Sequence, residues 1–176
     1  GVTVTAVNRS KTYGDTVTFA GTEFTASGLA AGDSVTSVTL TSAGASASAP
    51  VGTYDIVPAA AQGTGLANYA ITYVDGELTV NKASTLTVTP TAYTFQAGSE
   101  PALPLEYSTD GFESGDSFTS EGYVAPTCVA KDGEGNTVVV SSALAWGTYT
   151  ITCSGAVAGN YESVDQTATA QLRVAP

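Results

Sequence analysis

The chain repeats itself once, and this repeat constrains the fold more than any other feature of the sequence. Residues 28–37 match residues 111–120 at six of ten positions, and every large apolar position stays apolar. Further matching segments follow the same order in both copies: residues 2–5 with 86–89, 51–56 with 146–151, 68–69 with 160–161, and 78–80 with 172–174. This pattern predicts one small folding unit that occurs twice.

The spacing of the matching segments indicates where the copies differ. It grows from 84 residues near the start to about 95 further on, so the second copy contains an insertion. The simplest position for it is a hairpin at residues 131–136. We therefore predict two domains, residues 1–82 and 83–176. Only five residues, 81–85, separate them, and so short a linker favours an end-to-end arrangement over a free tether.

Local patterns predict strands nearly everywhere. Thr and Val alternate in short runs at residues 35–40, 86–89, 137–140 and 149–153, and Gly, Pro, Asp and Asn separate these runs. No stretch of a dozen residues has the 3.6-residue period of an amphipathic helix. We expect an all-β protein of two small antiparallel β domains, with an immunoglobulin-like sandwich favoured. The alternative is a β-grasp-like sheet with one helical turn at residues 28–33 and 111–116.

The alternation also predicts which side chains form the cores. Tyr149, Ile151 and Cys153 point one way along their strand, while the intervening threonines point the other way. Tyr54 and Ile56 follow the same pattern in the first copy. Four large aromatic side chains are expected to fill the second core as packing residues: Phe95, Phe112, Phe118 and Trp146.

Charge and composition exclude several classes of function. The chain has 16 acidic and 5 basic residues, a net charge of −11, and no His. Because the chain is acidic, nucleic acids and anionic lipid surfaces are poor partners. Because it has no His, His-dependent catalysis and His-ligated metal sites are excluded. No apolar run is long enough to span a bilayer, so we expect no membrane insertion within this sequence. We expect a protein that is not an enzyme and needs no cofactor.

Cys128 and Cys153, the only cysteines, each lie in a strand-like run of the second copy. A disulfide between them is the favoured interpretation, and it would place the protein in an oxidising compartment. The alternative is two buried free thiols; a metal site is disfavoured because the chain has no His. Pro58 occupies the position of Cys153 in the first copy, so the bond would be specific to the second.

Aromatic and acidic side chains alternate in residues 106–123 of the second copy. A flat ring can stack on a pyranose while carboxylates accept bonds from its hydroxyls, so we consider this segment as a possible ligand-binding site. Its residues would be Tyr107, Asp110, Phe112, Glu113, Asp116, Phe118 and Tyr123. The alternative is a solvated acidic loop. The spacing of a calcium-binding loop is absent, and the acids are near one another only in sequence, which is weak support for a glycosidase.

Lysines and Asp-Gly pairs have simpler interpretations. Lys11, Lys82 and Lys131 lie beside turn or linker signals, so we expect them to provide surface charge rather than an isopeptide crosslink. The pairs at residues 75–76 and 132–133 favour backbone with positive φ, and a hairpin is expected at each.

The first copy resembles the YGX-type MBG repeat of bacterial secreted adhesins and cell-surface proteins. The residues that carry the resemblance are Lys11-Thr12-Tyr13-Gly14-Asp15, Gly28-Leu29-Ala30-Ala31-Gly32-Asp33, Val51-Gly52-Thr53-Tyr54, Asn68-Tyr69-Ala70-Ile71 and Gly76-Glu77-Leu78-Thr79-Val80. The second copy is diverged, with Ala97-Gly98-Ser99 in place of Tyr-Gly-Asp. The resemblance implies a stalk or display module and supplies no catalytic residues.

From these observations we expect a spacer in an extracellular or surface-bound bacterial protein, holding a distal binding head away from the cell. Its partners would be neighbouring repeats of the same chain. One alternative is a binding module for a host glycan or host protein through loops of the second copy. Another is an accessory domain of a secreted polysaccharide-degrading enzyme.

Overall fold

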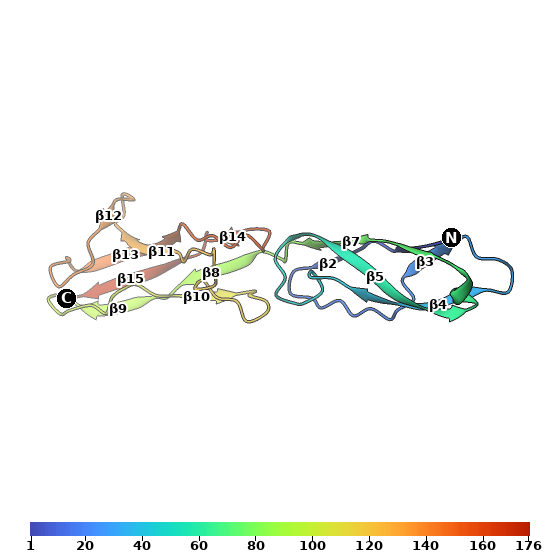
Figure 1. Cartoon of the computed structure of the whole chain (residues 1–176). Coiled ribbons are helices and arrows are strands. Elements are labelled where there is room, and N and C mark those ends of the chain that lie inside the picture. The colour runs from blue at the N-terminus through green and yellow to red at the C-terminus, as the bar shows by residue number, and fades with distance from the viewer. The chain divides into compact units, whose positions relative to one another are not determined.

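The computed structural model describes residues 1–176, and its regular structure consists of strands and one turn of 3₁₀ helix (Figure 1). The chain divides into two units, Gly1–Ala83 and Ser84–Pro176. The first contains β1 (Val2–Ala6), β2 (Arg9–Thr12), β3 (Phe24–Ser27), β4 (Ser34–Thr41), β5 (Gly52–Thr64), η1 (Leu66–Asn68), β6 (Ile71–Val74) and β7 (Gly76–Asn81). The second contains β8 (Leu86–Pro90), β9 (Tyr93–Gln96), β10 (Tyr107–Asp110), β11 (Thr127–Lys131), β12 (Thr137–Val138), β13 (Gly147–Ser154), β14 (Val164–Asp165) and β15 (Thr169–Ala175).

Each unit is built from two sheets with the same strand order. The first unit has the sheets β3-β1-β6 and β2-β7-β5-β4. The second has β10-β8-β14 and β9-β15-β13-β11, and β12 extends the latter. Every strand of the first unit therefore has a counterpart in the second, and β12 alone is extra. The prediction of an all-β tandem repeat is confirmed.

The prediction of purely antiparallel sheets is wrong in one respect. β1 pairs with β6 in parallel, and β2 pairs with β7 in parallel; β8 with β14 and β9 with β15 repeat this arrangement. The cause is that two long segments of the chain each cross from one sheet to the other partway along their length. β1 continues into β2 of the other sheet, and β6 continues into β7 in the same way. Because these two segments run side by side in the same direction, both strand pairs are parallel.

Two local predictions change for related reasons. The Asp75-Gly76 pair is not a hairpin, because it is where the chain crosses from one sheet to the other between β6 and β7. Residues 28–33 form a turn rather than a helix, closed by a hydrogen bond from the Asp33 N–H to the Ala30 carbonyl (3.1 Å). The β-grasp-like alternative needed a single sheet and that helix, and neither is present.

The apolar cores lie between the two sheets of each unit. In the first unit, Val4 of β1 packs with Ile56 of β5 and Leu78 of β7, all fully buried. In the second, Ile151 of β13 and Leu172 of β15 are also fully buried. The inward direction of Tyr149, Ile151 and Cys153, and of Tyr54 and Ile56, is confirmed by the burial pattern of β13 and β5.

Trp146 is not a core residue, although it was predicted as one. Its side chain is 69% exposed. The strand period explains this position, because Trp146 has the same parity as Thr148 and Thr150, which face solvent. Phe95 packs against the second core, as expected. Phe118 is buried, but it packs with Phe112 in a separate cluster of aromatic rings.

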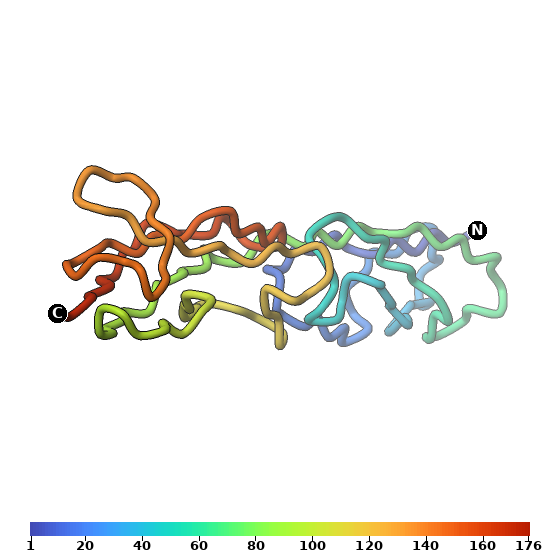
Figure 2. Tube along the Cα trace, turned by 90° about the vertical axis from the view of Figure 1, so that its left-hand side faces the viewer, coloured from blue at the N-terminus to red at the C-terminus, as the bar shows by residue number.

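The inserted hairpin is formed by β11 and β12, and the segment after β11 projects from the body of the second unit (orange in Figure 2). Asp132 holds its turn by accepting hydrogen bonds at Oδ1 from the N–H groups of Glu134 and Asn136, both 2.9 Å long. These bonds, led by that from Asn136, lower the pKa of Asp132. The positive φ falls on Gly135 rather than on Gly133. The predicted strand through residue 140 ends at Val138.

The turn after the second strand is shared by both units. In the first, the Asp15 N–H donates to the Thr12 carbonyl (3.0 Å), and Gly14 has a φ of 97°. In the second, the Ser99 N–H donates to the Gln96 carbonyl (3.1 Å), and Gly98 has a φ of 85°. Side chains other than that of glycine are strained at such angles, so this glycine is needed in both copies.

Lys11 is buried, with only 8% of its side chain exposed, so the expectation that it is a surface charge is wrong. It lies on the inward face of β2, opposite Val80, and its Nζ donates hydrogen bonds to the carbonyls of Asp15 (2.8 Å) and Ser46. Burial lowers the pKa of Lys11, and the nearby Asp15 carboxylate partly opposes this effect. Phe95 takes the same place in the second unit, opposite Val174.

Replacing Lys11 by Met is expected to lower the free energy of unfolding of the first unit by about 1–3 kcal/mol, because two carbonyls lose a charged donor. Exposed Lys82 is the matched control, and K82M should change stability by less than about 0.5 kcal/mol. Urea unfolding of each variant measures both effects. A K11M protein as stable as the wild type would show that these bonds contribute nothing net.

Lys11 also makes the stability of the first unit depend on pH, and the direction of its pKa shift gives the sign of this dependence. Its folded pKa lies below the ordinary value of 10.5, so the unfolded chain binds more protons between the two values. The stability of the first unit should therefore rise with pH as pH approaches 10.5 from below. K11M should lack this rise.

Candidate functional site

An aromatic and acidic cluster forms in the loop after β10, where the sequence predicted a binding segment. Asp116 is at its centre. Its Oδ2 accepts hydrogen bonds from the hydroxyls of Tyr123 (2.9 Å) and Tyr161 (2.8 Å). The Tyr161 hydroxyl in turn accepts from the Glu113 N–H (2.9 Å), and the Tyr123 hydroxyl accepts from Asn160 Nδ2 (2.9 Å).

The first unit contains a smaller version of the same cluster. The Tyr69 hydroxyl donates to Asp33 and accepts from the Ala30 N–H (2.9 Å). Asp33 and Tyr69 correspond to Asp116 and Tyr161 in the repeat. This shared Tyr-Asp pair ties the turn before the fourth strand to the loop before the sixth. Its presence in both copies marks it as part of the scaffold.

Burial and hydrogen bonding perturb the two tyrosines. Burial is the main cause that raises the pKa of Tyr161, with a smaller contribution from its bond to Asp116. The bond to Asp33 is the main cause that raises the pKa of Tyr69. Both hydroxyls therefore stay protonated at neutral pH and act as fixed donors to the carboxylates.

The predicted aromatic residues pack on one another around this pair. Phe112 contacts Phe118 and Tyr161 edge to face, with ring centroids 5.0 and 5.8 Å apart, and Tyr107 meets Phe118 at 6.1 Å. Phe118 is buried, and Tyr107, Phe112 and Tyr123 are half-buried. A shallow depression of about 370 Å³ lies beside them. The rings thus form a small satellite core.

The two remaining predicted residues lie outside this cluster. Asp110 ends β10 opposite Thr87, with its side chain exposed, and the Glu113 side chain is also exposed. Only the backbone of Glu113 joins the network. Sequence reasoning missed Tyr161 and Asn160, although the repeated Asn-Tyr at residues 68–69 and 160–161 was the available signal. No group of three or more acidic or cysteine side chains is placed to hold a metal ion.

The predicted disulfide is present between Cys128 and Cys153. The two residues are direct partners across the β11–β13 pair. In the first unit, Leu40 and Pro58 are the corresponding partners across β4 and β5, and both are buried. An apolar contact in one copy is thus replaced by a covalent bond in the other.

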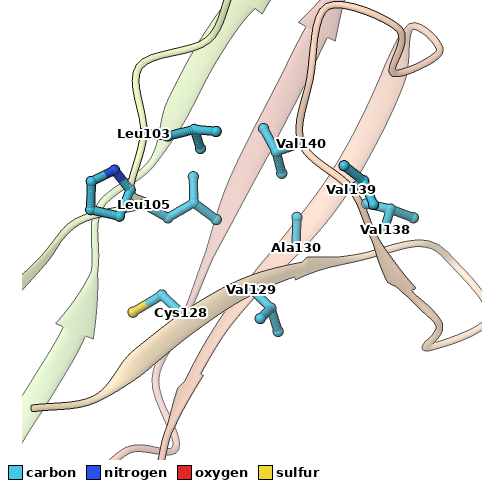
Figure 3. A pocket seen from close by; sticks show the side chains of 9 residues that line it. Leu103, Leu105, Cys128, Val129, Ala130, Val138, Val139 and Val140 are labelled. Carbon is cyan, nitrogen blue, oxygen red and sulfur yellow. The ribbon is translucent and has the colours of Figure 1, made fainter.

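An apolar pocket of about 490 Å³ opens beside the disulfide, between β11, β12 and the segment before β10 (Figure 3). Ala130 and Leu105 are buried in it, whereas Leu103 and Val139 are 57% and 80% exposed. Its lining residues are Leu103, Pro104, Leu105, Cys128, Val129, Ala130, Val138, Val139 and Val140. The lining has no acidic, basic or hydroxyl side chain, so the pocket offers no group for acid–base or nucleophilic chemistry.

The exposed side chain of Trp146 lines a second hollow, of about 400 Å³. Thr148 of β13 and Gln171 and Arg173 of β15 line it, and Thr148 is the direct cross-strand partner of Arg173. These three side chains are exposed. The hollow therefore lies on the solvent face of the five-stranded sheet, on the side away from the core.

Together these features define a tandem repeat module with two-sheet β units. The family model of the MBG domain (YGX type) matches residues 2–79 and again residues 86–171. The chain belongs to this family and contains two copies of its domain. A comparison with curated proteins gave no match.

The family and the disulfide both indicate an extracellular repeat module. The glycine of the YGX signature is Gly14, whose positive φ is required by the turn after β2. None of the helical structure has the length and apolar character that a membrane span requires.

Proposed function

We propose that this chain is a non-enzymatic spacer of a bacterial surface protein, which holds a distal binding head away from the cell. The observation that carries the proposal is the path of the chain through each unit. A spacer must carry the polypeptide from one end of each domain to the other, so that every added repeat adds length.

Both units meet this requirement. The first strand begins beside the loop before β6, where the Val2 N–H donates to the Ala70 carbonyl (3.0 Å). β1 and β2 then run on in one direction for 11 residues, which corresponds to about 35 Å of extended chain. The last strand ends at the far end of β2, where the Tyr13 N–H donates to the Asn81 carbonyl (2.8 Å). The chain therefore enters and leaves each unit at opposite ends.

The second unit repeats this path with equivalent contacts. The Leu86 N–H donates to the Ser163 carbonyl (3.0 Å) at one end, and the Ala97 N–H donates to the Ala175 carbonyl (2.8 Å) at the other. The second and last strands, β2 with β7 and β9 with β15, lie side by side in parallel near the point of exit in both units. The several backbone hydrogen bonds that join these two strands would therefore share a force that pulls on the chain.

A replacement experiment tests the spacer proposal. A binding head of known ligand is displayed on bacteria through this chain, through an unrelated pair of β domains of equal length, or with no spacer. We expect equal capture of ligand-coated beads with the first two and reduced capture without a spacer. If the unrelated pair fails to restore capture, this chain contributes more than distance and the proposal is wrong.

A further inference from the structure

The five-stranded sheet of the second unit has an unusual outer face for so acidic a chain. Its strands β9, β11, β12, β13 and β15 contain no Asp or Glu, although the whole chain has 16. They do contain two of the five basic residues, Lys131 and Arg173. Both alternate outward, away from Ala130 and Leu172 of the core. This face is therefore the one positively charged sheet surface of an acidic unit.

Hydroxyl and amide groups fill the space between the two cations. Lys131 lies opposite Thr150, which lies opposite Gln171, so these three form one row across the sheet. Arg173 lies between Thr148 and Thr94 in a second row. The result is a flat surface of hydrogen-bonding groups bounded by two positive charges.

Trp146 stands at the edge of this surface, beside Thr148 and Arg173. Its indole has no aromatic neighbour in contact and is 69% exposed, so the face of the ring is open to a ligand. Arg173 makes no ion pair, in contrast to Arg9, which pairs with Glu23 (3.7 Å) and lies over the Phe19 ring. The group thus combines an open stacking surface with an unpaired guanidinium.

The chemistry of Trp146, Arg173 and the neighbouring Thr and Gln side chains favours one class of ligand. A guanidinium binds a carboxylate through two parallel hydrogen bonds. An indole offers a flat apolar surface for the C–H face of a pyranose, and the Thr and Gln side chains suit its hydroxyls. We propose that the outer face of β13 and β15 binds an acidic polysaccharide, with a uronic acid ring on Trp146 and its carboxylate on Arg173.

The first unit lacks this site, which makes the feature specific to the second. Val51 stands at the position of Trp146, and Thr79 stands at the position of Arg173. The shared scaffold of the repeat therefore has no need of either side chain. Their appearance together in one copy, across neighbouring strands, supports a joint role in binding.

Fluorescence titration tests the proposal, because Trp146 is the only tryptophan. The whole chain is titrated with oligogalacturonate, with a neutral galactan oligosaccharide of equal length, and with polyglutamate. We expect a saturable change with oligogalacturonate and at least about tenfold weaker binding of the other two. No saturable change, or equal binding of polyglutamate, would overturn the proposal.

Variants separate the roles of the two side chains, with calorimetry as the readout where the indole is removed. W146A and R173Q should each weaken oligogalacturonate binding about tenfold or more, and R173K should restore only part of the loss. L103A changes an exposed residue of the apolar pocket, and K82Q changes an exposed residue of the first unit. Both are matched controls and should bind as the wild type does. Binding of W146A or R173Q at wild-type strength would contradict the proposal. Thermal unfolding of every variant confirms that the fold is kept.

Discussion

Replacing Cys128 and Cys153 together by Ala should lower the free energy of unfolding of the second unit by about 3.5 kcal/mol. The bond closes a loop of 25 residues, and the loop-entropy model gives this value for its loss. The first unit has Leu40 and Pro58 at the corresponding positions and contains no disulfide. Its stability should therefore not change. Hydrogen exchange measured at increasing urea concentrations reports the stability of the two units separately.

Reductant provides the control for this prediction. It should lower the stability of the second unit in the wild-type protein to that of the double variant, and it should have no effect on the variant itself. If the variant lost less than about 1 kcal/mol, the strand pairing of β11 with β13 would be holding the loop without the bond. Equal destabilisation of both units would show that they unfold together.

Replacing Tyr161 by Phe should lower the stability of the second unit by about 2 kcal/mol. The change leaves the Glu113 N–H without its acceptor and removes one of the two tyrosine donors to Asp116, at a position that is 2% exposed. Y69F is the matched change in the first unit. Tyr69 is less buried than Tyr161, so its loss should cost about 1 kcal/mol or less.

A double-mutant cycle with D116A shows whether the Tyr161–Asp116 bond is the cause. The two substitutions should be less costly together than the sum of each alone, because either one already removes the bond. Additive effects would contradict the assigned role of the pair and would leave the lost bond from the Glu113 N–H as the cause of the cost of Y161F.

The same tyrosine predicts the alkaline behaviour of the second unit. The folded pKa of Tyr161 is raised above its ordinary value of 10.0, so its contribution is complete below pH 10. Above pH 10 the unfolded chain loses this proton while the folded chain keeps it, and stability falls as pH rises. The difference in stability between wild type and Y161F should shrink over this range. A constant difference up to pH 12 would contradict it.

The repeat made much of the fold predictable, because matching segments must occupy matching strands. The period of two in residues 149–153 placed Ile151 and Cys153 inward without knowledge of their partners. The parallel pairs could not be predicted in this way. They depend on which sheet a strand joins after residues 7–8 and 75, and no local pattern reports a pairing between segments that are about 70 residues apart.

The errors at single residues have a similar origin. Lys11 resembled a surface lysine because its neighbours signal a turn, and its burial follows only from the pairing of β2 with β7. The sequence correctly predicts aromatic rings near Asp116 in the acidic segment. Tyr161, whose hydroxyl donates a hydrogen bond to that carboxylate, lies 45 residues away and was missed. The size of Trp146 favours the core, whereas the alternation of the strand that follows it, β13, already points it outward.

The central claim is that one two-sheet fold occurs twice, each time with its own core. The most direct test expresses residues 1–83 and 84–176 separately and compares their amide NMR spectra with that of the whole chain. We predict that each half gives a dispersed spectrum whose resonances overlay those of the intact protein, apart from residues near the cut. A half that gives the narrow spectrum of an unfolded chain would contradict the claim.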